Sequence, residues 1–274
     1  MTQIRGARAK KSLGQHWLVD PRILSRIVDA VGIEPEDTVV EIGPGTGQLT
    51  KHLVKRASHL IAVEMDDRLA PALVEMYAGD ERVHVVHADA LEASVEEILS
   101  LGEGGLPYVV VGNLPYNVGT AIIRRFLQSR TPPRRIVATL QAEVAERMAA
   151  KPGKMNYLAA ETQIFAEVRL LFRVPARAFR PPPRVHSAVV RLDVHPSPDV
   201  EVDNVQAFIQ LVQAGFAAPR KRLRNSLAIG LGIEASEVDA ILAERGVDGE
   251  QRPAMLGLEA WREVYLAYRR RATA

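Results

Sequence analysis

Short apolar runs alternate with longer amphipathic runs through the N-terminal part of the chain. The apolar runs are typical of strands buried on both faces, and the amphipathic runs have the period of helices. We predict strands at 38–42, 60–63, 83–86, 108–111 and 135–140, and two more at 167–174 and 186–192 around a proline-rich turn. Alternation of this kind indicates a mostly parallel sheet covered by helices, so the expected fold class is α/β.

The pattern changes at His195-Pro196-Ser197-Pro198, which is typical of a linker. Beyond it, the spacing of apolar residues predicts helices at 204–216, 219–229, 235–245 and 258–270, and no strand. We therefore expect a basic N-terminal tail at 1–12, a domain built on the sheet at 13–197 and a small helical domain at 198–274.

A helix precedes the first strand. Asp20 is a suitable N-cap for it, Pro21 suits its first turn and Gly32 ends it. The residues directly before this helix place the polar pair Gln15-His16 among apolar neighbours. A loop of this composition, held against the start of a helix, could cover a pocket.

Composition narrows the possible chemistry. The 274 residues are 47% hydrophobic and 25% charged, with a net charge of +2, which are ordinary values for a globular protein. The chain has no cysteine. This excludes disulfides, cysteine-ligated zinc, iron–sulfur clusters and methylation of a pyrimidine carbon through a cysteine adduct. The histidines show no metal-binding spacing, and no apolar run has the length of a membrane span or a signal peptide's core. We expect a cytoplasmic protein without a metal.

Three predicted strand ends carry residues suited to adenosine. Gly43, Gly45 and Gly47 form a G-x-G-x-G turn, whereas the dinucleotide fingerprint is G-x-G-x-x-G, so the spacing argues against NAD. Glu64 ends the second strand, where a carboxylate can accept both hydroxyls of a ribose. Asp89 follows the third strand, within reach of an adenine amine. Several cofactors contain adenosine, and these residues alone do not choose among them.

The fourth strand is followed by Asn113-Leu114-Pro115-Tyr116. Open α/β sheets bind ligands at the carboxyl ends of their strands. An amide acceptor beside a flat ring suits a planar base that carries an amine. Taken alone, the four residues could equally be a strand-ending turn with Tyr116 in the core.

Several motifs together resemble one family, the ribosomal RNA adenine N6,N6-dimethyltransferases. Asn113–Tyr116 is similar to the (Asp/Asn/Ser)-Pro-Pro-(Tyr/Phe/Trp) motif of amino-methyltransferases, and it occurs together with Glu41-Ile42-Gly43-Pro44-Gly45-Thr46-Gly47. Further similarity lies in Lys11-Ser12-Leu13-Gly14-Gln15, in Phe179-Arg180-Pro181-Pro182-Pro183-Arg184-Val185-His186-Ser187-Ala188 and in Arg220-Lys221-Arg222-Leu223-Arg224-Asn225-Ser226-Leu227. The last of these resembles the members that act on the small ribosomal subunit.

The resemblance implies an S-adenosylmethionine-dependent methyltransferase with a Rossmann-like sheet. Its cofactor would be bound by His16, Leu18, Gly43, Gly45, Glu64, Asp89 and Asn113. Its target adenine would be held by Asn113 and the Leu114 carbonyl, which Pro115 orients, with Tyr116 stacking on the base and Phe179 on its other face. Where the family usually has Asn-Phe, this chain has His16-Trp17.

The implied substrate is small-subunit (16S) rRNA within a pre-assembled small ribosomal subunit, with dimethylation of two adjacent adenosines near its 3′ end. Arg220, Lys221, Arg222 and Arg224 would contact RNA phosphates from the helical domain, and clusters at 124–125 and 130–135 are further candidates. We expect a monomer. The alternatives are a large-subunit rRNA methyltransferase that confers macrolide resistance, a non-catalytic assembly or transcription factor of the same fold, and an NAD-dependent dehydrogenase.

Overall fold

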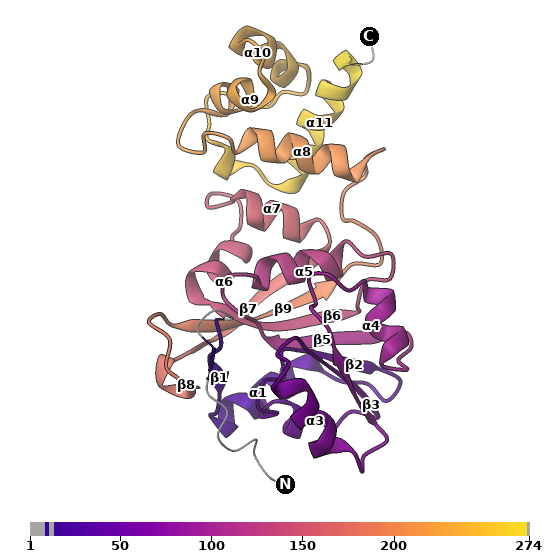
Figure 1. Cartoon of the computed structure of the whole chain (residues 1–274). Coiled ribbons are helices and arrows are strands. Elements are labelled where there is room, and N and C mark those ends of the chain that lie inside the picture. The colour runs from indigo at the N-terminus through magenta and orange to yellow at the C-terminus, as the bar shows by residue number, and fades with distance from the viewer. Residues whose placement is uncertain (1–8, 11–13, 273–274) are drawn as a thin grey trace. The chain divides into compact units, whose positions relative to one another are not determined.

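Among the described residues, seven strands form one sheet in the order β4-β3-β2-β5-β6-β9-β7 (Figure 1). The computed structural model describes residues 9–10 and 14–272. The strands are β2 (Thr38–Ile42), β3 (His59–Glu64), β4 (Val83–His87), β5 (Tyr108–Asn113), β6 (Arg135–Gln141), β7 (Ala166–Val174) and β9 (Ser187–Val194). Strands β2 to β6 pair in parallel, and β9 is antiparallel to β6. The predicted α/β fold is therefore confirmed.

The strand order reverses between β2 and β5. These two strands are neighbours although β3 and β4 lie between them in the sequence, and Ile42 is paired with Gly112. The glycine turn after β2 therefore lies beside Asn113 at the end of β5. Such a reversal is the point at which open α/β sheets bind their ligands.

Helices flank the sheet. They are α1 (Pro21–Val31), α2 (Thr50–Leu53), α3 (Leu69–Tyr77), α4 (Val95–Leu101), α5 (Gly119–Leu127) and α6 (Ala142–Met148). The predicted start and end of α1 are confirmed, because Asp20 accepts hydrogen bonds from the amides of Arg22 and Ile23, and Gly32 has a φ of 58°. The apolar face of α1 is buried where the helix packs against β6 and β9.

Two very short strands lie outside the main sheet, and neither was predicted from the sequence. Strand β1 (Trp17–Leu18) pairs antiparallel with β8 (Phe179–Arg180), and the short helix η2 (Ala176–Ala178) precedes β8. Two residues are too few for a period-two pattern to be recognisable in a sequence. This pairing fixes the segment before α1 against the connection between β7 and β9.

The second unit is helical. It contains α7 (Tyr157–Gln163), α8 (Val205–Gly215), α9 (Leu223–Leu231), α10 (Ala235–Glu244), η3 (Pro253–Met255) and α11 (Leu258–Ala272). Its core surrounds Trp261, Phe208 and Tyr265, which are almost completely buried. Gly215 is required here, because a Cβ at this position would lie 2.1 Å from the indole of Trp261.

The division of the chain differs from the predicted one in one respect. One unit comprises 1–145 and 167–194, and the other comprises 146–166 and 195–274. The predicted boundary near 197 is close to the second crossing, but α7 belongs with the C-terminal helices. The reason is burial, since Ala159, Ala160 and Ile164 share one apolar cluster with Phe208 and Trp261. Of the predicted basic tail, 1–8 and 11–12 lie outside the described residues.

Candidate functional site

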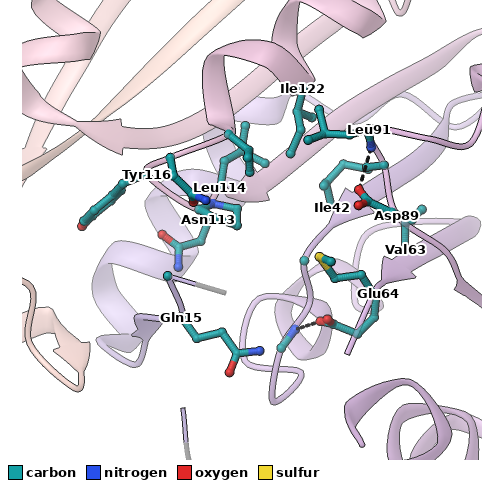
Figure 2. A pocket seen from close by; sticks show the side chains of 18 of the residues that line it. Gln15, Ile42, Val63, Glu64, Asp89, Leu91, Asn113, Leu114, Tyr116 and Ile122 are labelled. Carbon is teal, nitrogen blue, oxygen red and sulfur yellow. Dashed lines mark hydrogen bonds between the residues drawn. The ribbon is translucent and has the colours of Figure 1, made fainter. Parts of the chain in front are cut away.

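A cavity of about 160 Å³ lies at the reversal of strand order (Figure 2). It is lined by Gly43 and Gly45 from the turn after β2, by Glu64 from β3, by Asp89 from the loop after β4 and by Asn113 from β5. All five were predicted from the sequence as site residues, and the fold brings them together. His16 and Tyr116 line the same cavity.

The glycine turn is open on one side and closely covered on the other. Gly43 has a φ of 68°, and a Cβ built on it would meet no atom within 4 Å. Gly45 has a φ of 59°, and its Cβ would lie 2.8 Å from Cδ1 of Trp17. Backbone at Gly43 is thus free to contact a ligand, whereas Gly45 makes room for the indole of β1.

Glu64 is oriented by backbone amides. Its side chain accepts from the amide of Gly45 through Oε2 and from the amide of Asp66 through Oε1, each at 2.9 Å. Burial raises the pKa of Glu64, and these two hydrogen bonds oppose the increase. Each carboxylate oxygen keeps a second lone pair, so the pair remains able to accept from two neighbouring hydroxyls.

Asp89 has one oxygen engaged and one available. Oδ1 accepts from the amide of Leu91 at 2.8 Å, a turn that fixes the side chain at the end of β4 (Figure 2). Oδ2 makes no further hydrogen bond to the described residues. It is an acceptor suited to an exocyclic amine.

The segment before α1 is attached to the cavity through Asp66. The buried carboxylate of Asp66 accepts from Lys10 at 3.2 Å, from Gln15 at 3.0 Å and from Arg68 at 2.7 Å. These contacts, that of Arg68 above all, hold the pKa of Asp66 well below its usual range. This attachment was not predicted, because Asp66 belongs to none of the motifs recognised in the sequence.

The side-chain amide of Asn113 has a hydrogen-bond partner for its nitrogen but none for its oxygen among the described residues. Its Nδ2 donates to the backbone carbonyl of His16 at 2.6 Å. Because a carbonyl can only accept, this contact identifies the nitrogen of the amide and therefore also its oxygen. Oδ1 is buried and has no partner among the described residues. No described backbone amide donates to the adjacent Leu114 carbonyl. Buried acceptors are nearly always paired, so an orphan beside a cavity indicates a ligand donor.

Tyr116 is also fixed in place. Its hydroxyl is 2.6 Å from Oγ of Ser187, and burial raises the pKa of the phenol. The imidazole of His16 stacks on the phenol ring with 5.6 Å between centroids and an interplanar angle of 23°. Nδ1 of His16 lies 2.8 Å from the carbonyl of Pro181, so Nδ1 carries the proton. The side chain predicted to contact the cofactor therefore lies against Tyr116.

Phe179 does not lie in the cavity, which corrects its predicted place on the target base. Its side chain is completely buried in the hydrophobic core of the unit. The cause is register, because Phe179 is paired with Leu18 and both side chains pack into that core. Leu18 likewise is absent from the lining of this cavity, and it lines instead a small secondary cavity together with Gly43 and Asn113.

Several lining residues were missed by sequence reasoning. Met65 directly follows Glu64 and is 44% exposed, unusual for a large apolar side chain at the end of a buried strand. Leu91 and Ile122 add apolar surface on the side of Asp89 (Figure 2). Only their positions could have indicated them. Met65 directly follows Glu64, Leu91 lies two residues after Asp89, and Ile122 lies near the start of α5.

The predicted RNA-contacting residues divide into two pairs. Arg220 and Lys221 are exposed and form no ion pair with the described residues. Arg222 pairs with Glu250, and Arg224 pairs with Asp239 at 3.2 Å and Glu250 at 3.5 Å. The latter two therefore also stabilise the start of α9.

Three arginines of the other predicted clusters have structural partners. Arg125 donates to the carbonyls of Glu92 and Ala93. Arg134 pairs with Asp37, and Arg135 pairs with Asp193. These contacts attach helices and loops to the sheet, so a role in binding phosphates is not needed to explain these arginines.

The described part of the chain shows neither a metal site nor a membrane-spanning helix. It contains no cluster of three or more side chains arranged to hold a metal ion. None of its helices combines the length and apolarity of a membrane span.

The cavity brings together a glycine turn, the Glu64 carboxylate and the unpartnered acceptor of Asn113, an arrangement that fits the class of S-adenosylmethionine-dependent methyltransferases. The family model described as "Ribosomal RNA adenine dimethylase" matches residues 6–263. The chain therefore belongs to the ribosomal RNA adenine dimethylase family, and the resemblance seen in the sequence is confirmed.

Relatives and solved structures agree with this assignment. The chain is 40% identical over 261 residues to the ribosomal RNA small subunit methyltransferase A of Dehalococcoides mccartyi (strain CBDB1), covering 95% of this chain and 89% of that protein. It is 42% identical over 260 residues to the protein of the same name from Bacillus mycoides (strain KBAB4), covering 93% and 89%.

Among solved structures, the 23S rRNA methyltransferase ErmE has a TM-score of 0.72 at 28% identity, covering 92% of this chain and 98% of that one. A dimethyladenosine transferase from Plasmodium falciparum has a TM-score of 0.79 at 24% identity, covering 94% and 98%, and supports the fold.

Proposed function

We propose that this protein dimethylates N6 of two adjacent adenosines near the 3′ end of small-subunit rRNA. The observation that carries the proposal is the amide of Asn113, whose Nδ2 is fixed by the His16 carbonyl while its buried Oδ1 has no partner. An acceptor oriented in this way, beside a glycine turn and the flat ring of Tyr116, fits an amine on a planar base.

The lining residues fit S-adenosylmethionine. Gly43 offers open backbone to the amino-acid end, Glu64 two oriented acceptors to the ribose and Asp89 one acceptor to the adenine amine. When bound, the cofactor supplies a methyl group already activated by its sulfonium. No nucleophilic side chain is then required, in agreement with the absence of cysteine.

The residues of the Asn113–Tyr116 motif activate the amine by orientation. An adenine N6 lone pair is delocalised into the ring and is therefore a poor nucleophile. Oδ1 of Asn113 and the carbonyl of Leu114 can accept hydrogen bonds from the two N–H groups. This favours a more tetrahedral nitrogen with a localised lone pair. Pro115 limits the direction of these acceptors, so their orientation is established before the reaction. The nitrogen gains the methyl group and gives up one of its protons to water, so a single N–H remains, and one acceptor can still bind it.

The target base must leave its stack to reach this cavity, and Tyr116 offers a face for it. Stacking on an aromatic side chain contributes about 1–3 kcal/mol per base. The phenol is held by Ser187, so it serves as a platform rather than as an acid or base.

Small-subunit rRNA is proposed over large-subunit rRNA because of the relatives. The two small-subunit relatives are 40% and 42% identical to this chain, whereas the 23S rRNA enzyme of known structure is 28% identical. The further expectations, namely a pre-assembled small subunit as the substrate, a cytoplasmic location and a monomeric enzyme, belong to the same proposal.

The experiment incubates the protein and labelled S-adenosylmethionine with unmethylated small subunits, with large subunits and with naked DNA. We expect label in small-subunit rRNA, recovered as N6,N6-dimethyladenosine. Label in large-subunit rRNA alone would transfer the proposal to the macrolide-resistance activity, and no label in any substrate would favour a non-catalytic assembly factor. Tight NADH binding without S-adenosylmethionine binding would instead indicate a dehydrogenase.

A further inference from the structure

The connection from β7 to β9 lies in an unusually basic part of the sequence. From 168 to 192 the chain contains six arginines and no aspartate or glutamate. Three of the six lie within strands. Arg169 pairs with Glu167, Arg191 pairs with Asp193, and Arg173 lies within β7. The remaining three are Arg177, Arg180 and Arg184, which we call the connection arginines.

The connection arginines are exposed and have no acidic partner among the described residues. Arg180 donates only to backbone carbonyls, at 3.2 Å to Phe179 and 3.5 Å to Arg177. These contacts fold the Arg180 side chain back over its own segment. They leave its charge uncompensated, in contrast to Arg134 and Arg135, whose charges are paired.

The same connection is fixed to the rim of the cavity at three points. Arg180 is paired with Trp17 in the β1–β8 ribbon. Pro181, the next residue, accepts from the His16 ring through its carbonyl, and Ser187 contacts the hydroxyl of Tyr116. His16, Trp17 and Tyr116 all line the cavity, so the backbone of 180–187 borders the side of the cavity that holds the target motif.

We propose that the connection arginines bind the RNA phosphates that flank the target adenosine. This inference rests on the proposed function. A nucleotide that is turned out of its stack keeps its own backbone outside the pocket, so the phosphates on its two sides lie at the pocket's rim. Cations there would hold the strand in position without reading its sequence, and their free charge is available because no carboxylate neutralises it.

The test measures binding of unmethylated small subunits as a function of salt concentration. The double variant Arg180→Gln/Arg184→Gln is compared with Arg56→Gln/Arg82→Gln, which removes the same charge from exposed arginines that pair with Asp29 and Asp80. We expect the first variant to bind about tenfold more weakly at physiological salt and to lose about 1.4 from the slope of log K against log salt, since each single-strand phosphate contact contributes about 0.7. The control variant should keep the wild-type slope.

S-adenosylmethionine binding and thermal unfolding are measured in parallel. Both should be unchanged in the double variant, because among the described residues the charged groups of Arg180 and Arg184 make no hydrogen bond or ion pair with Gly43, Glu64 or Asp89. A loss of slope that is equal in both variants, or absent from both, overturns the proposal. The wild-type protein could instead bind small subunits with the expected salt slope and transfer no methyl group. That result would overturn the proposed function but would still support the phosphate contacts.

Discussion

Asn113 is positioned by a carbonyl that lies 97 residues earlier in the chain. The orientation of the amide therefore depends on the loop before α1 as much as on β5. The same loop places the His16 ring on Tyr116, so one residue contacts both polar and aromatic parts of the target motif. At this scale the substitution of His16 for the usual Asn of the family changes the surroundings of Tyr116 rather than those of Glu64 or Asp89.

Tyr116 provides the first prediction. If it is a stacking platform, Tyr116→Phe should keep methyl transfer within a few-fold of wild type, because it retains the ring and loses only the contact with Ser187. Tyr116→Ala should lower kcat/KM by about 10- to 100-fold through the lost stacking energy. Steady-state kinetics on small subunits, with Ser187→Ala as the control, separate the two effects. An equal loss in both Tyr116 variants would contradict the platform role.

Some residue roles could be predicted from the sequence, and others could not. Gly43, Glu64, Asp89 and Asn113 follow strand ends, and a parallel sheet brings strand ends together whatever the details of packing. Phe179 was misplaced because an aromatic residue beside prolines looks the same in a sequence whether it faces a cavity or the core. The orphan state of Oδ1 depends on which neighbour binds Nδ2, and only the structure shows that neighbour.

At the scale of elements, strand β2 carries a buried acid. Glu41 is 1% exposed, and its Oε2 has no hydrogen-bond partner among the described residues. Burial raises the pKa of Glu41 to about 8, and the nearby Glu64 carboxylate adds to the increase. Glu41 is therefore protonated in the folded protein at neutral pH, whereas it is ionised in the unfolded chain.

This difference gives a prediction with a definite sign. Between pH 5 and pH 8 the unfolded state has lost the Glu41 proton and the folded state keeps it, so the free energy of unfolding should fall as pH rises. The contribution is about 1.4 kcal/mol per pH unit and ends above the folded pKa. In Glu41→Gln this component is missing, and urea unfolding at pH 5, 6.5 and 8 should show a smaller decrease than in wild type. Parallel pH profiles for the two proteins would show that Glu41 titrates normally.

The strands were predictable because their composition is nearly uniform. Buried parallel strands such as β3 and β5 contain unbroken apolar runs, at 60–63 and 108–111, which stand out against amphipathic helices. Strands β1 and β8 were missed because their pairing is decided by tertiary contacts.

At the scale of the molecule, the first unit contains the cavity and the second unit is helical. The first unit contains every residue predicted for the cofactor and the target base. The second contains Arg220 and Lys221 at the start of α9, which are exposed and without ion pairs among the described residues. The sequence predicted two domains, but it could not predict that α7, encoded between β6 and β7, belongs to the second.

The basic start of α9 gives a prediction with an internal comparison. Arg220→Gln/Lys221→Gln should weaken small-subunit binding and reduce the salt slope by about 1.4, because both cations are available to phosphates. Arg222→Gln/Arg224→Gln should instead lower the free energy of unfolding, by about 1 kcal/mol or less, since it breaks exposed pairs with Glu250 and Asp239. Salt-dependent binding and urea unfolding of both variants check this division. A reduction of the salt slope seen only in Arg222→Gln/Arg224→Gln would reverse this assignment of roles.

The measurement that tests the central claim most directly is methyl transfer by Asn113→Ala. The wild-type protein should convert unmethylated small-subunit rRNA to N6,N6-dimethyladenosine, detected by mass spectrometry of the digested RNA. Removing the oriented acceptor should lower kcat by about 100-fold or more, in the range measured when one preorganised polar group is deleted from an active site. S-adenosylmethionine binding, measured by calorimetry, should persist in the variant. An Asn113→Ala protein that binds the cofactor and transfers methyl groups at the wild-type rate would contradict the account.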